Sequence, residues 1–148
     1  MEAIIFIGIQ ASGKSTFFKE RFADSHMRLN LDMLKTRHRE KILLQAMLEA
    51  KQPFVVDNTN PAISDREPTI AAAKAARFRV VGYYFQSSAK QAIERNAGRE
   101  GHAVVPERAI LGTYNRLELP TWDEGFDELY YVSCGDGSFE VQEWSDEV

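Results

Sequence analysis

The pattern of apolar and polar residues begins with an unbroken apolar run near the N-terminus. Residues 3–7, Ala-Ile-Ile-Phe-Ile, carry no polar side chain. Such a run predicts a strand covered on both faces, as in a parallel sheet between two layers of helices. Shorter runs predict four more strands, over residues 27–31, 54–56, 79–85 and 129–133. Residues 139–144 follow a Gly-Asp-Gly turn and are expected to fold back as a hairpin.

The segments between these strands show helical spacing of apolar side chains. Helices are expected over residues 14–23, 32–50, 62–76 and 88–97, the last capped by Ser88. Pro106 suits the first turn of another helix, with Ile110, Tyr114 and Leu117 facing inward. Strands that alternate with helices predict an α/β fold of three layers, with a five-stranded, mainly parallel sheet. The 148 residues are the size of one ordinary domain, so residues 1–148 are expected to form a single unit.

The first expected strand runs into a complete phosphate-binding motif. Gly8-Ile9-Gln10-Ala11-Ser12-Gly13-Lys14-Ser15 matches G-x-x-x-x-G-K-[ST] between a strand and a helix. The two glycines allow a tight turn whose N–H groups point inward, and the helix N-terminus favours anions. Lys14 is expected to reach the β- and γ-phosphates of ATP, and Ser15 to ligate Mg²⁺. The expected ATP-binding residues of this segment are Gly8, Gln10, Ala11, Ser12, Gly13, Lys14, Ser15 and Thr16.

Charge and composition indicate which ligands and which cellular compartment suit this protein. The net charge is −4, but residues 117–148 contain no Lys or Arg, so all 18 basic residues lie in residues 1–116. An anionic ligand is therefore drawn to the first part, although the acidic tail could equally serve only solubility. The single cysteine, Cys134, fits a reducing compartment. No apolar run approaches the roughly 20 residues that span a bilayer, and no signal peptide is evident. A cytoplasmic protein without a membrane partner is expected.

The phosphate loop predicts nucleotide binding but leaves the reaction open, since hydrolysis and phosphoryl transfer both use it. Transfer is favoured because the chain is short for the larger ATPase machines. Two arginines, Arg95 and Arg99, flank a loop that could close over the phosphates. A lone carboxylate, Asp32, stands where the second strand runs into a helix.

Four segments resemble the kinase domain of the phage and metazoan 5′-hydroxyl polynucleotide kinases. They are the phosphate loop with Ser15-Thr16, then Asn30-Leu31-Asp32, the block 55–61 (Val-Val-Asp-Asn-Thr-Asn-Pro), and a lid from Glu94-Arg95-Asn96 to Val105-Pro106. Residues 119–126 are similar to the stretch before the last strand of the metazoan enzymes. The resemblance implies a P-loop kinase fold with a helical lid over about residues 95–106. Strand order 2-3-1-4-5, like that of nucleoside monophosphate kinases, is expected because Asp32 and Asp57 must both reach the nucleotide from strands on one side of the first. An acidic hairpin is expected over about residues 129–148. The resemblance implies ATP and Mg²⁺ as cofactors, and the 5′-hydroxyl end of a nucleic acid as acceptor.

The resemblance also implies roles for the acceptor-side residues. Asp32 would be the general base that takes the proton of the acceptor hydroxyl; read from the residues alone, it could instead cap the helix that begins there. The family usually carries an arginine three residues later, where this chain has Lys35. A lysine neutralises a phosphate as a point charge without the bidentate fork, which leaves the acceptor open.

The remaining candidates surround the transferred phosphate. Asp57 ends an apolar strand, where it could serve Mg²⁺ through a water, or position Lys35 as in the family. Asn58 is expected on the acceptor side, unless it only satisfies a local turn. Arg95 and Arg99 are expected on one helix face, with Arg99 the stronger candidate for stabilising the transferring phosphoryl group.

Two other functions stay open. One is a small-molecule kinase of the same fold, for a nucleoside, sugar or antibiotic hydroxyl, which Lys35 keeps possible. The other is a nucleotide-binding regulatory domain without catalysis, against which the set Lys14, Asp32 and Arg99 argues. The sequence does not determine the oligomeric state.

Overall fold

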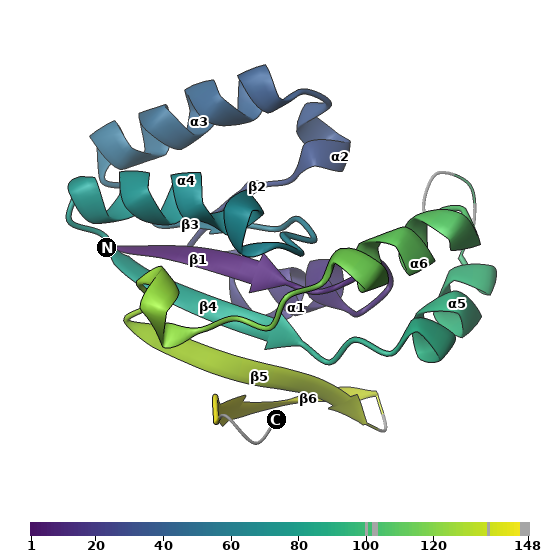
Figure 1. Ribbon diagram of the computed structural model, residues 1–148. Helices are drawn as coiled ribbons and strands as arrows, with labels where there is room; N and C mark the ends of the chain where they lie inside the picture. The colour runs from purple at the N-terminus through teal and green to yellow at the C-terminus, as the bar shows by residue number, and fades with distance from the viewer. Residues whose placement is uncertain (100, 102–103, 136, 146–148) are drawn as a thin grey trace.

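The computed structural model, which describes residues 1–99, 101, 104–135 and 137–145, is built on one six-stranded sheet (Figure 1). The strands lie in the order β2-β3-β1-β4-β5-β6, and the first five are parallel. Their bounds are β1 Glu2–Ile7, β2 Met27–Leu29, β3 Phe54–Val56, β4 Arg79–Phe85, β5 Glu128–Gly135 and β6 Ser138–Glu143. Because β1 lies between β3 and β4, the phosphate loop that follows it leaves from the middle of the sheet.

Helices cover both faces of this sheet, as the unbroken apolar run predicts. Ile5 and Ile7 pack in one apolar cluster with residues of α3 (Arg37–Ala50) and α4 (Ile63–Ala75). Ile4 and Phe6 point to the other face, where they pack with Phe17 and its neighbours in α1 (Lys14–Arg21). Alternate side chains of β1 therefore enter two separate cores, and the predicted three-layer α/β fold is confirmed.

The predicted number of strands is wrong by one. The first five strands lie in the predicted order, but β6 pairs antiparallel with β5 and extends the sheet to six. The hairpin itself was expected; its second half is a full edge strand because six consecutive residue pairs, from Tyr130↔Glu143 to Gly135↔Ser138, are in register. Residues 136 and 146–148 of the predicted acidic hairpin lie outside the described residues.

The long helix predicted over residues 32–50 is also corrected, because the structure divides it in two. The short helix α2 spans Leu31–Leu34, and α3 begins at Arg37. Between them Lys35 has φ 76°, and the Thr36 side chain caps α3 by accepting from Arg39 N at 3.1 Å. A threonine that caps a new helix competes with continuation of the old one, and apolar spacing does not register that competition.

Two helices lie beyond the carboxyl ends of β1 and β4 (Figure 1). They are α5 (Ala89–Ala97), capped by Ser88 as predicted, and α6 (Glu107–Arg116). Ile110 is buried between them, whereas Tyr114, predicted to face inward, is 43% exposed because this helix pair has only one covered side. Residues 100 and 102–103 of the predicted lid lie outside the described part of the chain. A short 3-10 helix, η2 (Trp122–Glu124), precedes β5.

Among the described residues, no helix is both long and apolar enough to cross a membrane.

Candidate active site

The phosphate loop turns tightly at the carboxyl end of β1. Ala11 and Gly13 both have positive φ, 60° and 98°, and Gly13 immediately precedes α1. A Cβ on Gly13 would lie 2.9 Å from the Phe139 ring, so glycine is required both by the backbone and by the space. Ile9 and Ala11 are buried against Ala92 and Ile110. The loop is thus held from one side by the α5–α6 pair.

The loop is held from its other side by the segment that follows β3. Gly8 N donates to Thr59 O at 3.0 Å, and Asn60 Nδ2 donates to Phe6 O at 2.8 Å. Asn60 itself has φ 44°, a conformation that asparagine tolerates better than most residues. The Asn-Thr-Asn segment that follows Asp57 therefore supports the geometry of the phosphate loop.

Lys14 begins α1 and is nearly buried, at 9% exposure. Its Nζ donates to Gly8 O at 2.9 Å, to Ile9 O at 2.6 Å and to Ser12 Oγ at 3.3 Å. Burial lowers the pKa of Lys14 to about 8; Asp57 raises it in opposition, Arg99 lowers it and Asp32 raises it. The charges of three other predicted site residues therefore act on one ammonium group, on which phosphates are expected to converge.

Asp57 follows β3 and is 1% exposed, but its partner is not the one predicted. Its Oδ2 accepts from Arg28 Nε at 2.8 Å and lies 3.4 Å from Ser15 Oγ. Lys35, which the family pattern pairs with Asp57, is exposed at the turn between α2 and α3. The hypothesis that Asp57 positions Lys35 is replaced by an ion pair with Arg28, because the parallel pairing of β2 with β3 sets Arg28 beside Val55, two residues before Asp57.

Asp32 is not the cap of its helix. The N-cap of α2 is Asn30, whose Oδ1 accepts from Met33 N at 3.1 Å and whose Nδ2 donates to Asp57 O at 2.6 Å. Asp32 lies in the first turn and is exposed. The interpretation of Asp32 as a mere helix cap is therefore wrong, because Asn30 caps this helix.

Asn58 acts inside the protein. Its Oδ1 accepts from Leu31 N at 2.9 Å, and its Nδ2 donates to Glu40 Oε2 at 2.8 Å. With both amide atoms engaged and the side chain buried, Asn58 holds α2 and α3 in place. It thereby positions α2, the helix that carries Asp32.

Two arginines and the C-terminal hairpin enclose a pocket of about 240 Å³ beside the loop. Arg95 Nη1 donates to Ala11 O at 3.2 Å. Arg99 lies beyond the end of α5, not on its face as predicted, because the helix ends at Gly98; both arginines still line the pocket. The lining residues are Ala11, Gly13, Thr16, Arg95, Arg99, Cys134, Gly137 and Phe139. Gln10, predicted to bind ATP, uses its Nε2 to bind Thr113 Oγ1 of α6 at 3.0 Å.

The sequence analysis missed two buried or half-buried arginines. Arg28 lies in β2, where a charged residue between Met27 and Leu29 was the available signal. Arg66 is fully buried in α4, on the same stripe as Ile70 and Ala73. It forms a two-pronged ion pair with Glu124, at 2.7 and 3.0 Å, and its Nη1 donates to Asn60 O at 2.9 Å. A charged residue on the apolar face of a helix indicates that a buried residue of opposite charge pairs with it, but does not identify that residue.

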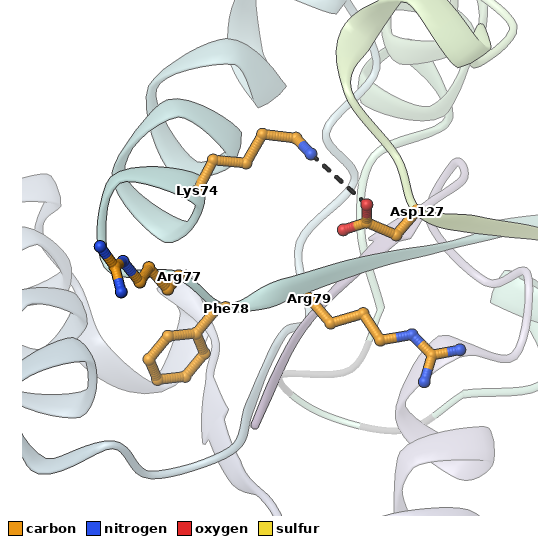
Figure 2. A pocket seen from close by; sticks show the side chains of 5 residues that line it. All are labelled: Lys74, Arg77, Phe78, Arg79 and Asp127. Atoms are coloured by element: carbon orange, nitrogen blue, oxygen red, sulfur yellow. Dashed lines mark ion pairs between the residues drawn. The ribbon is translucent and has the colours of Figure 1, made fainter.

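A second pocket, of about 520 Å³, lies at the amino ends of the strands (Figure 2). Lys74 at the end of α4 forms an ion pair with Asp127 at 3.6 Å, and Arg77, Phe78 and Arg79 complete the lining. Arg79 begins β4, whereas the phosphate loop follows the carboxyl end of β1. Ligands of open parallel sheets bind at the carboxyl edge, so this pocket is separate from the candidate active site.

The sheet carries a phosphate loop after β1 and carboxylates after β2 and β3, and two arginines lie in and just beyond α5. This arrangement defines a P-loop kinase-like domain. A family model described as an AAA domain matches residues 35–120, more than half of the 148-residue chain. The chain therefore belongs to this family. The matched range begins after the phosphate loop and includes Asp57, Arg95 and Arg99.

One curated protein is similar in sequence, and two solved structures share the fold. The chain is 32% identical over 136 residues to the bifunctional polynucleotide phosphatase/kinase of Schizosaccharomyces pombe, covering 88% of this chain and 33% of that protein. The chain thus spans about a third of that relative's length. The gluconokinase structure from Sinorhizobium meliloti 1021 has a TM-score of 0.64 at 20% identity, covering 89% of this chain and 82% of that one. Chaetomium thermophilum Kti12 in complex with ADP-AlF3 has a TM-score of 0.65 at 19% identity, covering 90% of both chains.

Proposed function

We propose that this protein is a kinase that transfers the γ-phosphate of ATP to the 5′-hydroxyl end of a polynucleotide. The observation that carries the proposal is the geometry at the carboxyl edge of the sheet. Lys14 begins the helix after the phosphate loop, Ser15 Oγ lies 3.4 Å from Asp57 Oδ2, and Arg95 and Arg99 line the adjoining pocket. Phosphoryl transfer needs a cation for the phosphates, a carboxylate for the acceptor hydroxyl and an arginine for the transferring group. Lys14, the exposed Asp32 and Arg99 can supply these three.

In this mechanism Lys14 exchanges its contacts with Gly8 O and Ile9 O for phosphate oxygens of ATP. Asp32 takes the proton of the acceptor hydroxyl while that oxygen forms a bond to the γ-phosphorus. The bond from the γ-phosphorus to the β–γ bridging oxygen breaks, and ADP leaves. Arg99 and Arg95 neutralise charge on the transferring group from the pocket side. The exposure of Asp32 suits a large acceptor that approaches from solvent.

The donors near Ser15 fit a magnesium ion. Ser15 Oγ and Asp57 Oδ2 are hard oxygen donors 3.4 Å apart, the type of ligand that Mg²⁺ prefers. No group of three or more acidic, His or Cys side chains that could hold a metal occurs among the described residues. Ser15, and Asp57 directly or through a water, would hold the ion together with nucleotide oxygens. When bound, it would supply charge neutralisation between the β- and γ-phosphates.

The polynucleotide acceptor is supported by two further observations. The relative from Schizosaccharomyces pombe, 32% identical over 136 residues, is named a polynucleotide phosphatase/kinase. Near Asp32 the chain presents a row of exposed cations in the turn and the first part of α3, namely Lys35, Arg37 and Arg39. Exposed cations beside a general base are suited to the phosphates of a nucleic-acid strand.

The deciding experiment is transfer of labelled γ-phosphate to a 5′-hydroxyl oligonucleotide, beside a panel of nucleosides, sugars and aminoglycoside antibiotics. We expect labelling of the oligonucleotide by the wild type and none by Lys14→Ala. A thermal melt of Lys14→Ala should show a folded protein, because the loop is also held by the hydrogen bonds from Gly8 N to Thr59 O and from Asn60 Nδ2 to Phe6 O. Labelling of a small alcohol alone would replace the polynucleotide by a small-molecule acceptor. ATP binding without transfer to any acceptor would favour a regulatory nucleotide-binding domain.

A further inference from the structure

The guanidinium of Arg28 contacts both oxygens that the proposed function assigns to magnesium. Arg28 Nε donates to Asp57 Oδ2 at 2.8 Å, and Arg28 Nη2 donates to Ser15 Oγ at 2.9 Å. The side chain of Asp57 is 1% exposed and that of Arg28 is 25% exposed. One cation of the protein itself therefore already serves this pair of oxygens, from the solvent side.

A buried carboxylate requires a cation in contact with it. Leaving one partner of such a pair without the other costs several kcal/mol. The ammonium of Lys14 donates to the loop carbonyls and to Ser12 Oγ. In the part of the chain that the structure describes, the ion pair of Asp57 is with Arg28. Arg28 thus supplies the counter-charge that holds the Asp57 side chain in place.

The surroundings of Arg28 allow it to move without leaving the protein surface. It lies on β2, the edge strand of the sheet, and its Cζ is 5.7 Å from the centre of the Phe18 ring. An aromatic face holds a guanidinium by about 0.5–1 kcal/mol at exposed sites. The Phe18 ring can therefore retain the side chain after its two oxygen contacts are broken.

We propose that Arg28 is the resident cation of the metal site and competes with Mg²⁺ for Ser15 and Asp57. When ATP brings its metal, the guanidinium yields both oxygens, so Arg28 sets the Mg²⁺ concentration at which nucleotide binds. It is a positioning residue, because it acts through Ser15 and Asp57. This inference rests on the proposed function, since it concerns the metal that accompanies ATP.

The first test measures ATP affinity by calorimetry across a Mg²⁺ series for the wild type and Arg28→Gln. We expect the half-saturating Mg²⁺ concentration to fall by about tenfold or more in Arg28→Gln, because this variant loses the charge-assisted hydrogen bonds to Asp57 and Ser15, each of which corresponds to about tenfold. The matched control is Arg21→Gln, which removes another arginine lying over a ring, 5.2 Å from the centre of Phe17, without touching Ser15 or Asp57. An unchanged or raised midpoint in Arg28→Gln overturns the inference.

A second test needs no nucleotide and follows thermal unfolding. In EDTA, Arg28→Gln should melt below the wild type, because Asp57 stays buried without its cation. Added Mg²⁺ alone should restore its melting temperature, while the wild type should respond little. In the double variant Arg28→Gln/Asp57→Asn, the Mg²⁺ response should disappear. If Mg²⁺ does not stabilise Arg28→Gln, competition at this site is refuted, even if the wild type is an active kinase. If Mg²⁺ does stabilise Arg28→Gln, the inference stands even if no phosphate transfer to an acceptor is observed.

Discussion

The ammonium group of Lys14 is nearly buried, and both acidic and basic side chains act on it. Burial lowers its pKa to about 8, against an ordinary value of 10.5; the charges of Asp57 and Asp32 act against this shift and that of Arg99 acts with it. In the free protein the charged form of Lys14 is therefore less favourable than in the unfolded chain. From this group alone, the free energy of unfolding rises as the pH increases from about 8 to 10.5, because the unfolded state then holds more protons.

Phosphates reverse this preference, which predicts a pH dependence of ATP affinity. Bound ATP favours the ammonium, so above pH 8 binding takes up a proton. We expect affinity to be insensitive to Lys14 below this pH and to fall by at most about tenfold per pH unit above it. Calorimetry from pH 7 to 10 would show the slope. Lys14→Met should bind more weakly and lack the slope; a slope retained in that variant would contradict the assignment to Lys14.

Asp32 can now be tested cleanly, since the cap of its helix is Asn30. Asp32→Asn should fold and bind ATP like the wild type, but its turnover should fall by about 10²–10⁴-fold, the usual value of general-base catalysis. The measurement is single-turnover transfer beside ATP titration. Asn30→Ala is the contrasting variant: it should lose about 1 kcal/mol of stability through the cap. Wild-type turnover in Asp32→Asn would remove the general base from the mechanism.

The break between α2 and α3 sets the position of Lys35 relative to Asp32. Apolar spacing predicted one helix, in which Lys35 would follow Asp32 by about one turn. Instead Lys35 ends α2 at φ 76°, its N–H donates to Leu31 O at 2.7 Å, and its side chain is exposed. The ammonium at this turn is available to an approaching acceptor.

If the acceptor is a nucleic-acid end, Lys35→Ala should raise the KM for the oligonucleotide with little effect on ATP affinity. The salt dependence of oligonucleotide binding should flatten by about one unit of slope for a duplex and less for a single strand. Lys35→Arg should bind at least as well, because a guanidinium adds the bidentate fork. Lys19→Ala, an exposed lysine of α1, is the control for loss of one charge. Equal salt slopes in wild type and Lys35→Ala would exclude Lys35 as a phosphate contact.

Arg66 connects parts of the molecule that lie far apart in the chain. From α4 it reaches Glu124 in η2 and three backbone carbonyls, those of Asn60, Pro61 and Glu118. Glu124 is only 5% exposed and also accepts from Thr121 N at 2.9 Å. The same arginine therefore ties the segment after Asp57 to the stretch that leads into β5.

Arg66→Met should destabilise the protein by about 3–5 kcal/mol, because it leaves the Glu124 carboxylate buried without a cation. Denaturant unfolding measures this loss. Arg116→Met, which removes an exposed partner of Asp65 at 3.2 Å, should change stability by about 1 kcal/mol or less. Arg66→Met/Glu124→Leu should recover part of the loss. If Arg66→Met unfolds at the same denaturant concentration as Arg116→Met, the buried pair does not hold the molecule together.

Local sequence was sufficient for the features whose cause is local. The unbroken apolar run 3–7, the spacing from Gly8 to Ser15 and the cap at Ser88 each depend on residues a few positions apart, and the structure has the strand, the tight loop and the capped helix. The order of the first five strands was inferred from the need for Asp32 and Asp57 to reach one nucleotide, and it agrees with the structure. The hairpin over residues 139–144 was expected, but not that its second half adds a sixth strand to the sheet. The break between α2 and α3 was not predicted, because helix capping competes with apolar spacing.

Only the tertiary structure determined the partners within the site. Arg28 and Asp57 are 29 positions apart, and Arg66 and Glu124 are 58 apart, so no periodicity of the chain relates them. Their contacts follow from which strands are neighbours and which loops leave the same edge of the sheet. A buried charge must find its counter-charge wherever the fold brings one. The sequence alone therefore determined that a phosphate loop stands at the head of an α/β domain, and the packing of the sheet determined which residues complete the site.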